Sequence, residues 1–203
     1  MPIQSIAVVD IETTGRNPQV GTIVEVGICE LDLQTGAIRK LFNSVCREAA
    51  FTTKFEARSL AEAWIFQHST LTPEDVLKAP AWDDIKDSLQ QILTSYPVTA
   101  YNQEFDFNFF RNRGLPVQTT LPDAMHVATP VLKLPYPKRS IQIYPPQMHT
   151  QPYKWPSVEE TWRYLYPETP YRETHRAYDD ATHEAQLIYG LFQRQIWAPA
   201  QKN

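Results

Sequence analysis

The chain has 203 residues, of which 42% are hydrophobic, and this is enough for one domain with a sizeable core. Its formal net charge of −4 and its isoelectric point near 5.7 exclude a broadly basic protein that coats nucleic-acid backbones. They do not exclude a protein that binds phosphates through metal ions, because bound cations reverse the local field.

The sequence carries no signal that predicts a membrane association. No apolar run is long enough to cross a bilayer, and the first residues lack the basic and then apolar pattern of a signal peptide. We therefore predict a cytoplasmic protein without a membrane partner, in which Cys29 and Cys46 stay reduced as structural thiols.

Apolar patterns predict strands at the start of the chain and mostly helices after them. The strands are expected at residues 6–10, 22–33 and 37–46, the last two joined by a turn at residues 34–36, and at residues 97–100. Helices are expected at residues 58–67, from residue 72 onward, and at residues 82–93, 105–113, 123–132, 157–166 and 179–195.

A proline- and aromatic-rich segment at residues 134–156 is predicted to be an insertion within a single domain that spans residues 1–203. With the basic side chains of Lys138, Arg139 and Lys154, its aromatic rings could clamp single-stranded nucleic acid. We favour the alternative, a cover packed on the core, because so many aromatic side chains need burial or a partner.

Two carboxylates, Asp10 and Glu12, follow the first apolar run in the stretch AVVDIETTG. Residues two apart in a strand point to the same face, so these like charges repel unless a cation lies between them. A solvated strand end is the alternative, since 23 acidic residues in a chain of 203 produce such pairs by chance. The turn expected at residues 13–15 favours a metal or catalytic role, because it bends the backbone beside the acids.

Three further candidate residues lie later in the chain. Asp106 stands among phenylalanines in YNQEFDFNFF, at the boundary of a buried helical stripe, where a plain helix cap is the alternative. His175 and Asp180 lie where the last helix begins, and the positive end of a helix favours carboxylates. A set of carboxylates with so little sulfur or imidazole suits Mg²⁺ or Mn²⁺ rather than Zn²⁺.

The segments VVDIETTG, YNQEFDFNFF and HRAYDDA resemble the three motifs of the DEDDh 3′→5′ exonucleases, the group that includes the proofreading subunit of the bacterial replicative polymerase. Between them, TIVEVGICELDLQTG, HSTLTPEDV and PDAM resemble the family's hairpin, a loop after it and the start of a helix. The resemblance covers most of the chain. It implies an α/β ribonuclease H-like fold, with a mixed five-stranded sheet flanked by helices.

The resemblance also implies a role for each motif residue. The acids expected to hold two divalent cations, Mg²⁺ or Mn²⁺, are Asp10, Glu12, Asp106 and Asp180, the third of them through water. His175 would be the general base, and Glu12 with the backbone near Thr13 would meet the terminal 3′-hydroxyl. The other expected substrate contacts are Ile11, Thr13, Thr14, Gly15, Asn102 and Phe105.

The predicted activity is metal-dependent hydrolysis of phosphodiester bonds from the 3′ end of single-stranded nucleic acid, with DNA favoured, to release nucleoside 5′-monophosphates. The alternatives are a polymerase-associated interaction subunit, an exonuclease for RNA or oligoribonucleotides, and a phosphohydrolase of small nucleotides. The expected partners are single-stranded 3′ ends and a polymerase or another replication or repair protein. Tyr101, where the family often has histidine, and the unusual insertion leave the choice of substrate and partner open.

Overall fold

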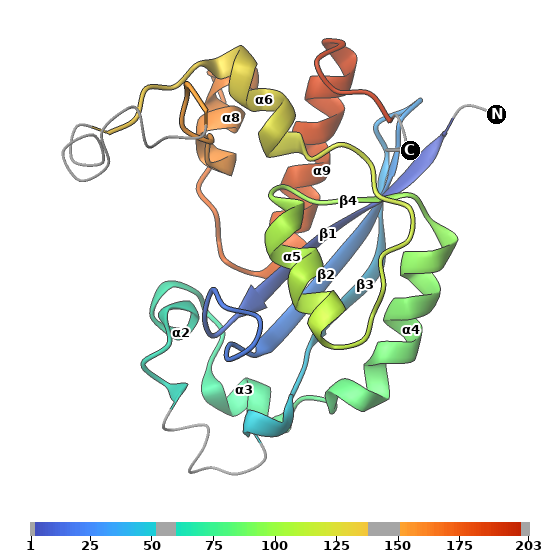
Figure 1. The fold of residues 1–203 in the computed structure, drawn as a ribbon, viewed down its shortest axis with the longest axis vertical. Helices are drawn as coiled ribbons and strands as arrows, with labels where there is room; N and C mark the ends of the chain where they lie inside the picture. The colour runs from blue at the N-terminus through green and yellow to red at the C-terminus, as the bar shows by residue number, and fades with distance from the viewer. Residues whose placement is uncertain (1–2, 52–59, 138–150, 200–203) are drawn as a thin grey trace.

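A mixed sheet forms the middle layer of the computed structural model, which describes residues 3–51, 60–137 and 151–199 (Figure 1). Its strands, in the order β3-β2-β1-β4 across the sheet, are β1 (Ser5–Thr13), β2 (Ile23–Asp32), β3 (Ile38–Val45) and β4 (Val98–Thr99). β1 pairs antiparallel with β2 and parallel with β4, and β2 pairs antiparallel with β3. The predicted hairpin of the second and third strands is confirmed.

The described residues form a sheet of four strands rather than the predicted five. Where a fifth strand would lie, Thr120 forms only an isolated parallel bridge to Val98. The backbone N–H of Val98 donates to the Thr119 carbonyl, and the N–H of Leu121 donates to the Val98 carbonyl, each at 2.9 Å. Pro122 follows at once and has no N–H with which to extend the ladder, so the pairing ends here.

Helices cover both faces of this sheet. They are α2 (Trp64–His68), α3 (Pro73–Lys78), α4 (Trp82–Ser95), α5 (Gln103–Asn112), α6 (Ala124–Leu132), α8 (Val158–Leu165) and α9 (Ala177–Gln193), with a 3-10 turn η1 (Ala49–Phe51). Thr72 and Ser157 form capping boxes with Asp75 and Glu160, which explains why α3 and α8 begin where the sequence predicts. The helix predicted at residues 58–67 begins outside the described residues, and α2 overlaps only its last part.

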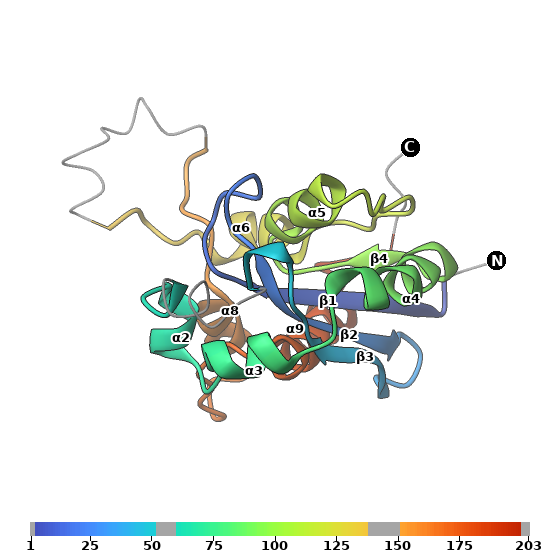
Figure 2. The same ribbon diagram turned by 90° about the horizontal axis from the view of Figure 1, so that it is seen from below.

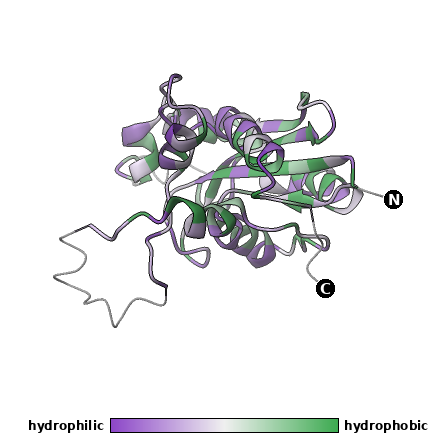
Figure 3. Ribbon diagram, turned by 90° about the horizontal axis from the view of Figure 1, so that it is seen from above, coloured by the Kyte–Doolittle hydropathy of each residue, from purple (hydrophilic) through white to green (hydrophobic). Residues whose placement is uncertain are grey.

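Alternate residues of β1 enter two separate cores. On one face, Ala7 and Ile11 pack with the apolar sides of α4 and α5, whereas Ile6 and Val8 on the other face pack with α6 and α9. Figure 2 shows α4 and α5 on one side of the sheet and α9 on the other, and Figure 3 shows hydrophobic residues along the strands between them. Because successive side chains change face, the two acids of β1 lie on the α9 side.

Gly27 lets α9 approach the sheet beside the first acid. It lies opposite Asp10 in the antiparallel register of β1 and β2. A Cβ atom on Gly27 would lie 2.2 Å from the carbonyl carbon of Ala177 and 2.3 Å from the backbone nitrogen of Tyr178. Any larger residue would therefore push the first turn of α9 away from Asp10.

Three other predictions concern the two cysteines, a membrane-spanning helix and the insertion. Cys29 and Cys46 are both buried, free thiols, as expected. Within residues 3–51, 60–137 and 151–199, no helix is both long and apolar enough to cross a membrane. In the insertion, Lys138 and Arg139 lie outside the described residues, so the choice between a clamp and a cover stays a prediction.

Candidate active site

Asp10 and Glu12 project from the part of β1 that lies beside the start of α9. The strand continues through both acids to Thr13, so the prediction that it ends at residue 10 was wrong. Antiparallel pairing to β2 supports the backbone as far as this point, and a register shift follows Glu12. The Oδ2 atom of Asp10 is buried and accepts no hydrogen bond from the described residues.

Asp180 lies in the first turn of α9, where the loop before the helix holds it. Its Oδ1 atom accepts hydrogen bonds from the Tyr171 hydroxyl at 3.0 Å and from the Thr174 N–H at 3.2 Å, and its Oδ2 atom accepts one from the Arg176 N–H at 3.1 Å. These donors fix the carboxylate in one orientation. It faces the acids of β1, four residues into a helix whose positive end favours a negative charge.

His175 reaches the same place from that loop. Its backbone has φ of 54°, in the left-handed region that non-glycine residues rarely adopt. One ligand atom each from Glu12, His175 and Asp180 lie within 4.8 Å of one another. The tertiary fold therefore brings together residues more than 160 positions apart in the chain.

Asp106 joins the group from α5. Beyond Val8, β1 no longer pairs with the short β4, and this leaves backbone N–H groups of β1 free on that edge. The N–H of Ile11 donates to Oδ1 of Asp106 at 3.2 Å, and only 3% of Asp106 is exposed. The alternative prediction, that Asp106 only caps a helix, does not account for this hydrogen bond. Its donor, Ile11, lies on β1 between Asp10 and Glu12.

The electrostatics of the group fit a divalent cation. Burial raises the pKa of Asp10, Glu12 and Asp106 well above the ordinary carboxyl value, and neighbouring carboxylates raise the first two further. Among the described residues, no lysine or arginine forms an ion pair with these acids or with Asp180. Converging carboxylate oxygens, one of them buried without a partner, suit a hard cation with oxygen ligands.

Two acids near the site, the buried Glu184 and the half-buried Glu173, were not singled out from the sequence. Glu184 lies one turn after Asp180, is 3% exposed, and accepts a hydrogen bond from the Tyr101 N–H at 3.2 Å. Burial raises its pKa well above the ordinary value, and so does Asp106. Burial followed by Asp180 raises the pKa of Glu173 to about 7. An acid within the apolar stripe of the last helix was the available signal for Glu184.

Glu25 shows how the fold treats a buried acid that has a different role. It lies opposite Glu12 on β2 and is 2% exposed. The Arg176 guanidinium forms an ion pair with it at 2.7 Å, and the Ala177 N–H donates to it at 3.2 Å. Glu25 therefore fixes the start of α9 on the sheet, and its charge is compensated within the protein.

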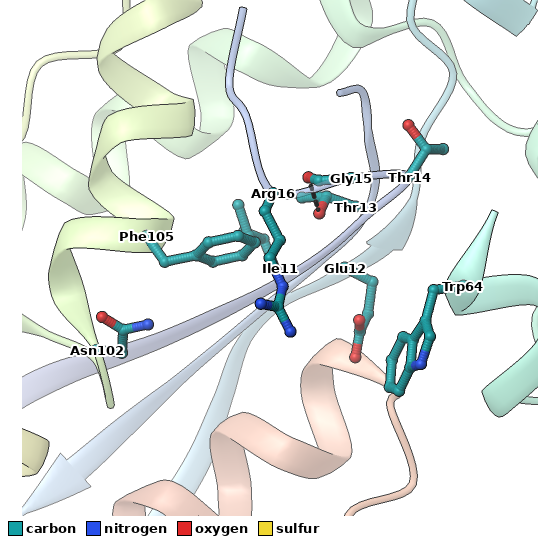
Figure 4. A pocket seen from close by; sticks show the side chains of 9 residues that line it. All are labelled: Ile11, Glu12, Thr13, Thr14, Gly15, Arg16, Trp64, Asn102 and Phe105. Atoms are coloured by element: carbon teal, nitrogen blue, oxygen red, sulfur yellow. Dashed lines mark hydrogen bonds between the residues drawn. The ribbon is translucent and has the colours of Figure 1, made fainter. Parts of the chain in front are cut away.

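A pocket of about 550 Å³ opens beside Glu12 (Figure 4). Its walls include every residue predicted to contact substrate, namely Ile11, Thr13, Thr14, Gly15, Asn102 and Phe105. Two further wall residues, Arg16 and Trp64, were not predicted. The turn after β1 is held by a hydrogen bond from the Thr13 hydroxyl to the Gly15 carbonyl at 2.9 Å.

The sequence matches the RNase_T family of exonucleases over residues 7–188, which is most of the chain. The chain belongs to this exonuclease family. The resemblance to DEDDh-type 3′→5′ exonucleases and the prediction of an exonuclease enzyme are thereby confirmed. Dependence on divalent metal ions is a property of the family, whereas the role of each site residue stays a prediction, as do a polymerase partner and a cytoplasmic location.

Known exonucleases are similar to this chain in sequence or in fold. The 3′-5′ exonuclease DinG of Staphylococcus epidermidis is 23% identical over 195 residues, which are 96% of this chain but only 19% of that protein. The nuclease domain of 3′hExo, a DEDDh family member bound to rAMP, has a TM-score of 0.68 at 15% identity, with 99% of this chain and 97% of that chain covered. E. coli Exonuclease I in complex with a dT13 oligonucleotide has a TM-score of 0.62 at 13% identity, over 95% of this chain and 42% of that chain. The predicted ribonuclease H-like fold class is confirmed, with four strands in place of five.

Proposed function

We propose that this protein removes nucleoside 5′-monophosphates from the 3′ end of single-stranded nucleic acid, with DNA as the favoured substrate. The observation that carries the proposal is the meeting of Glu12, His175 and Asp180 within 4.8 Å at the edge of a nucleotide-sized pocket. Family membership supports the reaction class, and the relatives in complex with rAMP and with dT13 support a nucleic-acid substrate.

In this proposal four acids hold two divalent cations, Mg²⁺ or Mn²⁺. Asp10, Glu12 and Asp180 are direct ligands, and Asp106, already bonded to the Ile11 N–H, holds one cation through water. When bound, such ions supply positive charge that favours ionisation of the attacking water and stabilises the departing oxygen. Among the described residues, Oδ2 of Asp10 is a buried oxygen without a hydrogen-bond partner, and a cation would supply one.

His175 accepts the proton of the attacking water at an imidazole nitrogen. Burial lowers the pKa of His175 below its ordinary value of 6.5, an effect that the nearby Asp180 opposes. The imidazole is consequently neutral at neutral pH and is able to take a proton. The backbone N–H groups of Thr174 and Arg176, on either side of His175, donate to Asp180 and so keep the base close to the ligand.

The pocket receives the 3′-terminal nucleotide. Glu12 and the backbone at Thr13 lie at the end of β1, where a terminal 3′-hydroxyl would meet them. Phe105 on one wall offers an apolar surface to the sugar or base, and Asn102 offers an amide. A 3′-phosphate would add two negative charges next to the acids, so such an end should be a poor substrate.

The decisive experiment uses end-labelled single-stranded DNA, duplex DNA and RNA with Mg²⁺, with Mn²⁺ or with a chelator. We expect a ladder that shortens from the 3′ end, releases mononucleotides and disappears with the chelator. Single-stranded DNA should react fastest, and a strand that ends in 3′-phosphate should react much more slowly than its hydroxyl counterpart. Release of mononucleotides from the 5′ end, or equal rates for the two kinds of 3′ end, would contradict the proposal.

A further inference from the structure

Tyr171 connects the acidic group to an aromatic cluster outside it. This half-buried residue lies in the loop that joins α8 to α9 (Figure 1), and its hydroxyl donates to Oδ1 of Asp180 at 3.0 Å. The roles proposed for the acids and for His175 do not involve this hydroxyl. Its position on a carboxylate that is expected to bind a cation therefore needs an explanation of its own.

Two aromatic rings hold the phenol ring of Tyr171 in place. Trp162 on α8 contacts it with ring centroids 4.9 Å apart and an interplanar angle of 37°, and His183 on α9 stacks on it at 4.3 Å and 28°. The indole N–H of Trp162 also donates to the Thr169 carbonyl at 2.8 Å, which anchors the loop two residues earlier. Because these contacts fix the ring, they also fix the direction of the hydroxyl toward Asp180.

The hydrogen bonds to Asp180 leave its two oxygens in different states. A carboxylate oxygen has about two lone-pair sites. On Oδ1, the Tyr171 hydroxyl and the Thr174 N–H occupy both of them, at 3.0 and 3.2 Å. On Oδ2, the Arg176 N–H at 3.1 Å is the only donor from the described residues, so one lone-pair site stays open there. Asp180 therefore offers a cation one oxygen rather than two.

We propose that the Tyr171 hydroxyl makes the cation site selective for Mg²⁺ over Ca²⁺, because it keeps Oδ1 of Asp180 from binding the ion. The inference rests on the proposed function, since it assumes that Asp180 is a direct ligand. Ca²⁺ takes about six to eight oxygen ligands, often both oxygens of one carboxylate, whereas Mg²⁺ takes about six and keeps several waters among them. A carboxylate with one open oxygen therefore satisfies Mg²⁺ but withholds a ligand from Ca²⁺.

The test measures the binding of Mg²⁺ and of Ca²⁺, each alone, to the metal-free parent and to Tyr171→Phe by calorimetry. This variant removes one hydroxyl and keeps the ring that Trp162 and His183 hold. Mg²⁺ should bind the variant more weakly, because Asp180 loses a bond that orients it. Ca²⁺ should bind it as tightly as the parent or more tightly, because Oδ1 becomes available. The Kd for Ca²⁺ divided by the Kd for Mg²⁺ should fall by about 10-fold, the usual scale when a partner of a metal ligand is removed.

Tyr166→Phe is the matched control. Tyr166 also contacts Trp162, with ring centroids 4.8 Å apart, but its hydroxyl donates at 3.0 Å to the Gln186 carbonyl rather than to a carboxylate. The control therefore removes the same chemical group from the same aromatic cluster, and the ratio of the two Kd values should stay at the parent value. Asp180→Asn identifies the site, because the binding that this variant weakens is the binding that involves Asp180.

Cleavage of single-stranded DNA gives a second readout. At a fixed Mg²⁺ concentration, added Ca²⁺ should inhibit Tyr171→Phe at an about 10-fold lower concentration than it inhibits the parent. Tyr166→Phe should be inhibited like the parent. Thermal melts in chelator identify a variant that does not fold, and Tyr171→Met, which also lacks the hydroxyl, then takes the place of Tyr171→Phe.

Two outcomes would overturn the inference, and they are distinct. If folded Tyr171→Phe keeps the parent's ratio of Kd values, either because nothing changes or because both ions bind equally more weakly, Tyr171 does not select the ion, and the proposed function is unaffected. If the parent binds neither ion through Asp180 and cleaves no strand, the proposed function fails, and the inference fails with it.

Discussion

On one face of β1, Ala7, Val9 and Ile11 are buried among apolar side chains of α4 and α5, whereas on the other face the strand ends in Asp10 and Glu12. Both faces are packed against helices, and both lie in the same strand. The apolar face stabilises the fold without any ligand, because burying its side chains removes them from water. The acidic face still needs positive charge, because its carboxylates have raised pKa values and one buried oxygen accepts no hydrogen bond from the described residues.

The difference teaches that the stability and the chemistry of this strand are separable. Side chains that face α4 and α5 lower the free energy of the folded state, while Asp10 and Glu12 on the α9 side raise it until positive charge is present. Variants on the two faces of β1 should consequently have opposite effects on stability and activity. Four predictions follow that comparison, from the largest expected effect to the smallest.

Asp10→Asn and Asp180→Asn should each lower kcat by about 10³-fold or more, because several kcal/mol of transition-state stabilisation depend on ions held by these carboxylates. In chelator, the same variants should melt at the parent's temperature or above it, since removing one of several crowded charges relieves repulsion. Thermal melts with and without Mg²⁺, together with single-turnover rates, measure both effects.

Val9→Ala is the matched control on the opposite face of the same strand. This fully buried side chain should cost about 1–3 kcal/mol of unfolding free energy when truncated and leave kcat close to the parent value. In chelator, strong destabilisation of Asp10→Asn and Asp180→Asn but not of Val9→Ala would show that the acids are structural. The proposed difference between the two faces would then be wrong.

His175→Ala should lower the chemical step by about 10²-fold to 10⁴-fold while binding of Mg²⁺ and of product stays intact, because the imidazole is assigned to proton transfer. The parent rate should rise with pH and level off, and since burial lowers the pKa of His175, this limb should be centred below 6.5. Rates at saturating Mn²⁺ across pH 5 to 9 test this. If His175→Ala keeps the parent's rise of rate with pH, another group is the base.

The stability of the metal-free protein should fall as pH rises. A carboxyl whose pKa is higher in the folded state than in the unfolded chain contributes stability below its ordinary pKa and loses it as pH passes through the folded value. For Glu173 that window runs from about 4.5 to about 7. Each unit of pKa shift is worth about 1.36 kcal/mol. The free energy of unfolding should therefore fall by on the order of a few kcal/mol when the acids of the site ionise.

Melting temperatures in chelator between pH 4.5 and 8 measure this loss. Added Mg²⁺ should restore stability, and most strongly at the upper end of the range, because there the ligands are already ionised. In Asp10→Asn the slope with pH should be shallower than in the parent. A metal-free parent that becomes steadily more stable toward pH 8 would contradict the proposed repulsion.

Arg16→Ala should have the smallest effect, a several-fold rise in KM with little change in kcat. The Arg16 side chain lines the pocket and makes no ion pair or hydrogen bond with any described residue, so it is free to meet a phosphate. Loss of one phosphate contact should reduce the slope of log affinity against log salt by about 0.7 for a single strand. Arg163→Ala on α8, exposed and away from the pocket, is the control whose slope should match the parent.

Local patterns in the sequence are sufficient to predict much of this protein. The capping residues Thr72, Asp123 and Ser157 mark helix starts, and apolar spacing identifies the strands that form the hairpin. These features depend on neighbours within a few residues, so they can be read without the fold. The three acidic motifs were identified in the same way, although their meeting at one place was only implied by the family resemblance.

Other features depend on contacts between distant segments, and the sequence alone did not predict them. The fifth strand is reduced to a bridge because only Thr120 reaches Val98 before Pro122 ends the pairing. Trp64 and Arg16 line the pocket because α2 and the turn after β1 meet there in space.

The acidic group itself shows the division between sequence and structure most clearly. The sequence determined which residues carry negative charge and that Asp10 and Glu12 share a face, because alternation is a property of any extended strand. Only the tertiary structure decided that Gly27 admits α9 to that face and that Asp106 bonds to the open edge of β1. The same packing buries Glu184 beside them. The pKa values rise because the packed helices exclude water, and the exclusion of water arises from close packing rather than from any local pattern of residues.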